Sequence, residues 1–92
     1  MAMHYKKIDI EYFEQIMNGE KTFELRLADF DCSPGDTLEL IEHDKSRALT
    51  GRTIRKKVGS VTKTKTLDFY NKQDIDEYGW QAISLVDEVS DE

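Results

Sequence analysis

Three charged residues close together in the sequence are the strongest candidates for chemistry in this chain. Lys21, Glu24 and Arg26 fall in the segment GEKTFELR, residues 19–26. If this segment is a strand, Glu24 and Arg26 project from one face about 6.6–7 Å apart, with Lys21 at the strand's start. A carboxylate acceptor beside cationic donors suits an amide or pyrimidine edge together with a phosphate. The alternative is a surface ion-pair ladder that serves only the fold.

Glu42 is a second candidate because of its place in an alternating segment. It shares strand parity with Leu38 and Leu40. If the two leucines point into the core, the carboxylate of Glu42 points inward as well and needs a partner. The alternative is that the strand ends before residue 42.

The residue types exclude several kinds of site. The chain has two histidines, His4 and His43, and one cysteine, Cys32, so no zinc-site spacing and no serine or cysteine triad pattern exists. Its five glycines are too dispersed for a phosphate-binding loop. We therefore predict no metal and no cofactor.

The charge is strongly segregated along the chain. The net charge of −6 argues against a protein coated in basic charge for non-specific nucleic-acid binding. From residue 52 to residue 65, however, every charge is positive. This basic ribbon supplies candidate nucleic-acid contacts at Arg52, Arg55, Lys56 and Lys57. The alternative is a solvated strand balanced by nearby carboxylates.

The length of 92 residues predicts a single domain, with a core over about residues 4–86 and an acidic tail over 87–92. A lone cysteine is typical of a reducing compartment. The longest apolar run has three residues, far short of the roughly 20 that span a bilayer. We expect a cytoplasmic protein without a membrane partner.

Hydrophobic periodicity predicts five strands and one convincing helix. The helix covers residues 10–18, with Asp9 as its cap and Gly19 as its stop. The strands are expected at 4–8, 22–27, 36–42, 53–64 and 81–86, with a bulge at Gly59. Residues 67–79 are compatible with a short helix or a packed loop.

These elements predict an α+β, mainly β fold, namely a small antiparallel β-barrel with one helix packed alongside. Strand parity places one set of apolar residues in the barrel: Phe23, Leu25, Leu38, Leu40, Ile54, Ile83 and Leu85. The helix is expected to cover the barrel through Phe13 and Met17.

The pattern Gly19-x-Lys21-x-x-Glu24-x-Arg26 resembles the signature of ASCH domains, which are PUA-like barrels. Further segments are similar to a bacterial and phage branch of uncharacterised ASCH-like proteins: His4-x-x-Lys7, Glu11-Tyr12-Phe13, Asp29-x-Asp31, Gly35-Asp36-x-Leu38-x-Leu40-x-Glu42 and Thr50-Gly51-Arg52. The likeness covers about residues 4–86. It implies a cleft between barrel and helix that binds RNA or a modified nucleoside, lined by Lys21, Glu24 and Arg26, with His4, Lys7 and Glu42 as neighbours.

One branch of ASCH domains consists of small amidohydrolases that deacetylate acetylated cytidine, with a threonine nucleophile three residues after the motif lysine. This chain has Glu24 at that position. Our preferred interpretation is therefore a non-catalytic module that binds RNA or a nucleotide. The second is a small amidohydrolase for a nucleoside-like amide such as acetylated cytidine, in which Lys21 polarises the carbonyl and Glu24 or Glu42 activates water. The third is a non-catalytic protein-interaction accessory.

Overall fold

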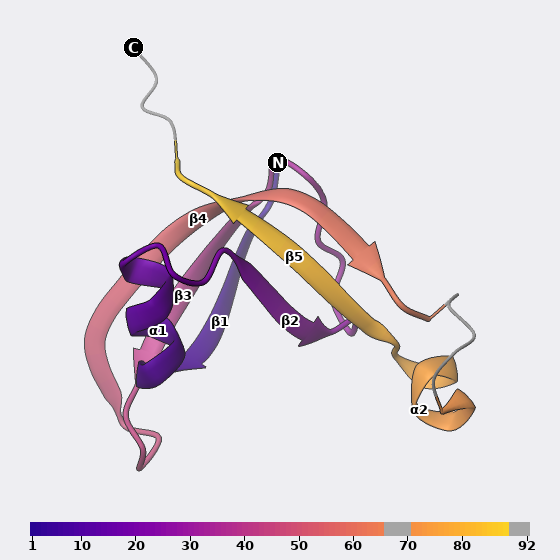
Figure 1. The fold of residues 1–92 in the computed structure, drawn as a ribbon, viewed down its shortest axis with the longest axis horizontal. Coiled ribbons are helices and arrows are strands. Elements are labelled where there is room, and N and C mark those ends of the chain that lie inside the picture. Colours follow the sequence, from indigo (N-terminus) through magenta and orange to yellow (C-terminus); the bar gives the residue numbers. More distant parts are fainter. Residues whose placement is uncertain (66–70, 89–92) are drawn as a thin grey trace.

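The computed structural model describes residues 1–65 and 71–88. The described residues form five strands and two helices (Figure 1). The number of strands agrees with the sequence prediction. In chain order the elements are β1 (Met3–Asp9), α1 (Ile10–Met17), β2 (Phe23–Leu27), β3 (Thr37–His43), β4 (Leu49–Lys63), α2 (Lys72–Glu77) and β5 (Trp80–Val86). The fold is mainly β, in agreement with the α+β expectation.

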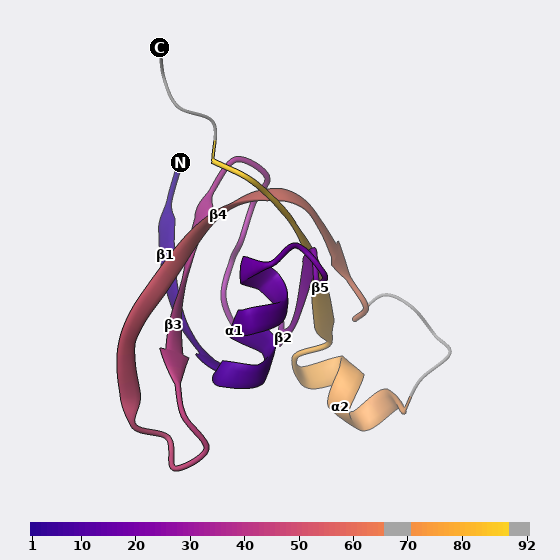
Figure 2. The ribbon, with the colours of Figure 1, turned by 60° about the vertical axis from the view of Figure 1, so that its left-hand side comes forward.

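The five strands form one mixed sheet in the order β1-β3-β4-β5-β2. The pair β1 and β3 is parallel, whereas the other neighbours are antiparallel. The sheet curls around α1 into an open half-barrel (Figure 2). The expected closed, wholly antiparallel barrel is therefore wrong. The chain passes through α1 and β2 between β1 and β3, and a connection of this length lets neighbouring strands run parallel.

Helix α1 fills the hollow of the curled sheet. The Asp9 side chain accepts a hydrogen bond from the Glu11 backbone N–H at 2.9 Å, which confirms the predicted cap. Phe13 and Ile16 are buried, but Met17 is 51% exposed. The expected cover by Met17 is wrong because Ile16, one residue earlier, faces the core instead.

The core lies mainly on β3, β4 and β5. Leu38, Leu40, Ile83 and Leu85 are buried as predicted, and Ile54 is partly buried against them. The register of β4 against β5 shifts between Val58 and Val61, which confirms the bulge expected at Gly59. A Cβ at Gly59 would lie 2.6 Å from Ser84 Oγ, so a larger residue at this position would have to displace the Ser84 side chain.

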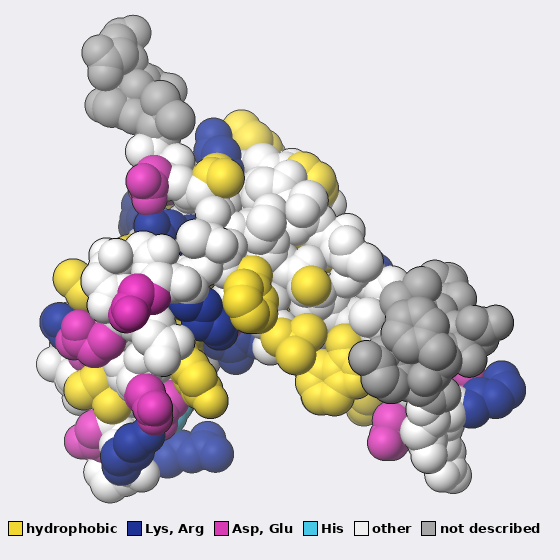
Figure 3. All heavy atoms as spheres, in the orientation of Figure 1, with side chains coloured by type: hydrophobic (Ala, Val, Ile, Leu, Met, Phe, Trp, Pro, Cys, Tyr) yellow, Lys and Arg dark blue, Asp and Glu magenta, His cyan; other side chains and the backbone are white. Residues whose placement is uncertain are grey.

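Strand β2 faces the opposite way from the prediction. Phe23 and Leu25 are 50% and 55% exposed, whereas Glu24 is 3% exposed. Figure 3 shows the hydrophobic side chains as a yellow row over β2. Alternation identifies the two faces of a strand but not which of them is buried. Here the inner face carries ion pairs, so the apolar row points outward.

Residues 72–77 of the ambiguous segment 67–79 form the short helix α2, with Ile75 buried. Part of that segment, residues 66–70, lies outside the described residues, as do residues 89–92 of the predicted acidic tail. Within the described ranges, every helix is too short to cross a bilayer.

Candidate functional site

A cleft lies between β1 and β2, the two edge strands of the open sheet, with α1 at one end. In Figure 3 it is the hollow between α1 and the yellow row, with dark blue side chains inside. Its volume is about 510 Å³, and its lining consists of Lys7, Ile8, Asp9, Tyr12, Lys21, Phe23, Glu24, Leu25 and Arg26. A cavity of this volume falls within the range of small-molecule sites.

The carboxylate of Glu24 is at the centre of the cleft's polar groups. Lys21 Nζ lies 3.3 Å from Glu24 Oε1, and Arg26 Nε donates to Oε2 at 2.8 Å. The side chain of Glu24 is 4% exposed, whereas those of Lys21 and Arg26 are 17% and 24% exposed. Both oxygens therefore have a cationic partner, which is what a buried carboxylate requires. The trio proposed from the sequence is assembled as one cluster.

Local backbone structure places the trio. Gly19 ends the helix with φ +84°, a conformation that favours glycine. The Lys21 backbone N–H then donates to the Gln15 carbonyl at 3.0 Å, which holds the start of the next segment against α1. Glu24 and Arg26 follow on one face of β2, and antiparallel pairing with β5 holds this strand in place.

Arg26 also connects the two edges of the sheet. Its Nη2 donates to the carbonyl oxygen of Lys7 on β1 at 2.8 Å. Lys7 contributes to the cleft through this carbonyl, while its side chain is exposed. Among the described residues, Arg26 Nη1 has no protein acceptor. The N–H groups on this edge of the guanidinium can therefore donate to a ligand.

Two aromatic rings flank the trio. Lys21 Nζ lies 4.9 Å from the ring centroid of Tyr12 on α1 and 5.0 Å from that of Phe23 on β2. Both rings are about half exposed. The sequence interpretation missed Tyr12 as a site residue and assigned Phe23 to the core. The available signal was that Tyr12 lies off the apolar face of the predicted helix.

The lining combines cationic, acidic and aromatic side chains. The lining holds two cationic side chains, Lys21 and Arg26, and two carboxylates, Asp9 and Glu24, together with the backbone carbonyl of Lys7. Tyr12 supplies the one hydroxyl in the lining formed by the described residues, and no serine, threonine, cysteine or histidine of that part contributes. Glu24 already accepts from two cations. The arrangement can hold an anionic or carbonyl group and accept a hydrogen bond.

Glu42 lies outside this cleft. It is fully buried, as its parity predicted, and Arg52 donates to it twice, from Nε at 2.8 Å and from Nη2 at 2.7 Å. Thr50 Oγ1 also donates to Glu42, and Arg52 reaches Glu14 on α1. The hydrogen bonds from Arg52 hold the pKa of Glu42 below its ordinary value despite burial. This cluster fastens α1 to the hairpin of β3 and β4.

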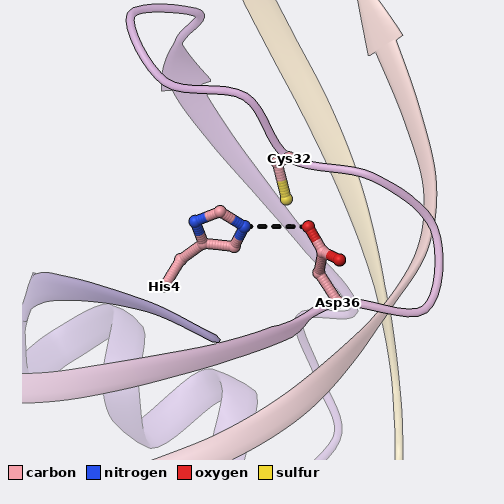
Figure 4. A group of neighbouring side chains, drawn as sticks. All are labelled: His4, Cys32 and Asp36. Atoms are coloured by element: carbon pink, nitrogen blue, oxygen red, sulfur yellow. Dashed lines mark hydrogen bonds and ion pairs between the residues drawn. The ribbon is translucent and has the colours of Figure 1, made fainter. Parts of the chain in front are cut away.

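His4 also lies outside the cleft. Its Nε2 is 2.9 Å from Asp36 Oδ2, and its ring packs against Phe30. Backbone hydrogen bonds from Ala2 and Ser33, together with His4, lower the pKa of Asp36 to about 2. Cys32 lies beside this pair (Figure 4). Burial, followed by the nearby Asp36 carboxylate, raises the pKa of its thiol.

The basic ribbon is divided between two faces of β4. Lys56 shares parity with the buried Val58, whereas Arg55 and Lys57 point to the other face. Arg52 pairs with Glu14 and Glu42, Arg55 with Glu39 at 2.8 Å, and Lys56 with Asp87 at 2.6 Å. Among the described residues, Lys57 has no ion pair. RNA contact by the ribbon stays a prediction, and Lys57 is the candidate whose charge is not already paired within that part of the chain.

Replacing Lys57 with alanine tests this prediction. If Lys57 contacts phosphate, the variant weakens binding of single-stranded RNA equally for all sequences and reduces the salt-dependence slope by about 1. Lys56→Ala is the matched control, and we expect it to keep the wild-type slope because Lys56 already faces Asp87. Binding measured from 50 to 200 mM salt gives the slopes. If the salt-dependence slopes of Lys57→Ala and wild type are identical, the ribbon is an ordinary solvated strand that does not contact phosphate.

The sequence matches, over residues 3–74, the family described as a domain of unknown function, DUF3850. The chain belongs to the DUF3850 family. The matched range includes every residue that lines the cleft. This DUF3850 chain is also similar to the crystal structure of the hypothetical protein PH0355, with a TM-score of 0.61 and 22% sequence identity over 92% of this chain and 97% of that one. That likeness supports the fold. No curated protein matches the sequence.

Proposed function

We propose that this chain binds a nucleotide or a modified nucleoside, free or within RNA, in the cleft between β1 and β2. The observation that carries the proposal is the buried Glu24 carboxylate, held between Lys21 and Arg26 and flanked by two half-exposed aromatic rings. The resemblance of residues 19–26 to ASCH domains supports the same ligand class. As part of this proposal, we infer that the chain is related to PUA-like domains and that it acts in the cytoplasm.

The parts of the ligand follow from the chemistry of the lining. A phosphate or carbonyl oxygen would accept from Lys21 and from Arg26 Nη1. An exocyclic amine or a sugar hydroxyl would donate to Glu24, because a carboxylate has about four acceptor sites and two of these are used here. The base would stack on Tyr12 or Phe23, a contact worth roughly 1–3 kcal/mol per base in single-strand binding proteins.

Binding through such contacts favours single nucleotides or unpaired bases. Only unstacked bases can present both a face and a polar edge to a narrow cleft. The overall charge of −6 opposes association with long unmodified RNA. We therefore propose a small or locally single-stranded ligand.

A map of backbone amide shifts tests the location of the site. A panel of cytidine, acetylated cytidine and the four ribonucleotides is titrated into the ¹⁵N-labelled protein. We expect the largest shifts at residues 7–9 and 21–26, with small shifts in the hairpin around Arg52. Shifts confined to β4, or to the outer face of β5, would place binding elsewhere and contradict the proposal.

A further inference from the structure

Three side chains with metal-ligating atoms meet at the end of the fold opposite to the Glu42 cluster. His4 lies on β1, Cys32 in the connection between β2 and β3, and Asp36 directly before β3. One ligand atom from each residue lies within 4.8 Å of those of the other two. Figure 4 shows the Cys32 sulfur beside the contact between His4 and Asp36, so that the three side chains point toward a common centre.

We propose that His4, Cys32 and Asp36 form a three-ligand site for a divalent transition metal of the zinc class. Imidazole, thiolate and carboxylate are the ligands that Zn²⁺ takes in proteins, whereas the sulfur disfavours Mg²⁺ and Ca²⁺. Three protein ligands leave the fourth tetrahedral position for water or an exogenous ligand. Within residues 1–65 and 71–88, this is the one such group of histidine, cysteine and acidic residues.

The distances fit this coordination after small side-chain movements. Tetrahedral zinc with bonds of about 2.0–2.3 Å places neighbouring ligand atoms roughly 3.4–3.6 Å apart. His4 Nε2 and Asp36 Oδ2 are 2.9 Å apart in a direct hydrogen bond, and no pair in the group exceeds 4.8 Å. An entering ion would separate the first pair by about half an ångström and draw the sulfur inward.

The surroundings hold the ligands in place. Backbone N–H groups of Ala2 and Ser33 each donate to the Asp36 carboxylate at 3.0 Å, and the His4 ring packs against Phe30 with centroids 5.4 Å apart. Such supporting contacts orient metal ligands. Cys32 and Asp36 are buried, while the His4 side chain is 17% exposed, which leaves an entry path on the side of β1.

The same three residues do not form an activated cysteine nucleophile. In such a site a histidine nitrogen takes the thiol proton and the other ring nitrogen faces the carboxylate. Here Nε2 faces Asp36, and the Cys32 sulfur lies on this same side of the ring, away from the other ring nitrogen (Figure 4). The thiol is also buried rather than exposed. Metal binding needs only small movements of the three side chains, and it is independent of the cleft because none of these residues lines it.

Cobalt titration tests the site because Co²⁺ bound to a thiolate gives a charge-transfer absorption in the near ultraviolet. Cys32 is the only cysteine in the chain, so any such band reports on this residue. We expect a 1:1 endpoint for the metal-free wild type. The band should vanish in Cys32→Ser, and His4→Ala should bind Co²⁺ at least about tenfold more weakly. His43→Ala, which removes the other histidine, is the matched control and should titrate like wild type.

Thermal melts separate metal binding from folding. A ligand that binds only the native state raises its melting temperature, so Zn²⁺ should stabilise wild type and His43→Ala but not His4→Ala. Circular dichroism without metal establishes that each variant is folded. If Cys32→Ser does not fold, the comparison of the two histidine variants decides. A wild type without a thiolate band and without a zinc-dependent melting shift, or equal losses in His4→Ala and His43→Ala, would overturn the proposal.

Discussion

Replacing Phe13 with alanine should lower the free energy of unfolding by about 3–5 kcal/mol, the largest loss of stability that we expect from a single apolar substitution. Phe13 is completely buried and belongs to the cluster that joins α1 to the strands. Truncation removes its transfer free energy and leaves a cavity in the hollow of the sheet. Since whole domains are stable by about 5–15 kcal/mol, much of the total would be lost.

Urea denaturation at 25 °C measures this effect, with Met17→Ala as the control on the same helix. Met17 is 51% exposed, so its truncation should cost far less. The difference between the two variants isolates burial from helix propensity, because both introduce alanine into α1. Equal losses for Phe13→Ala and Met17→Ala would mean that α1 does not dock through Phe13.

The second large effect is expected from Arg52→Met, which removes the partner of a fully buried carboxylate. Glu42 would keep only Thr50 and would have to be buried charged or become protonated, and either is costly. Arg55→Met is the matched control, since Arg55 pairs with Glu39 on the exposed face. We expect a much larger fall in melting temperature for Arg52→Met than for Arg55→Met.

The same cluster predicts a pH dependence. Hydrogen bonds from Arg52 lower the pKa of Glu42 from its ordinary value of 4.5. A group with a depressed native pKa stabilises the fold fully above its unfolded pKa and loses that contribution as the pH falls through the native value. In wild type this contribution is complete above about pH 4.5 and is lost below it, so the gap in stability between wild type and Arg52→Met should be smaller in acid than at neutral pH. A gap that widens in acid would show that Glu42 is not held ionised by Arg52.

Part of the fold could be predicted because local signals agreed with the tertiary structure. The helix of α1 has its cap at Asp9 and its stop at Gly19, and both act within a few residues. Leu38, Leu40 and Glu42 share the buried face of β3 as their alternation indicated. Lys21, Glu24 and Arg26 could be grouped from sequence because they are neighbours along the chain.

The inward face of β2 could not be predicted from alternation. Phe23, Leu25 and Leu27 are the more apolar face, and hydrophobicity alone assigns them to the core. The parallel pairing of β1 with β3 was not predictable either, because it joins segments far apart in sequence. The same pairing explains why His4 and Asp36, which are 32 positions apart, were not recognised as neighbours.

Calorimetric titration of acetylated cytidine, paired with an assay for acetate release, tests the proposed ligand cleft most directly. The proteins are wild type, Lys21→Ala, Glu24→Gln and Glu24→Thr, with Glu20→Gln as a control for an exposed carboxylate in the same segment. We expect wild type and Glu20→Gln to bind without releasing acetate, and Lys21→Ala and Glu24→Gln to lose binding. Acetate release only in Glu24→Thr would reveal a hydrolase site that lacks its nucleophile. Rapid release by wild type that disappears in Glu24→Gln would contradict the binding module and establish a carboxylate-based amidohydrolase.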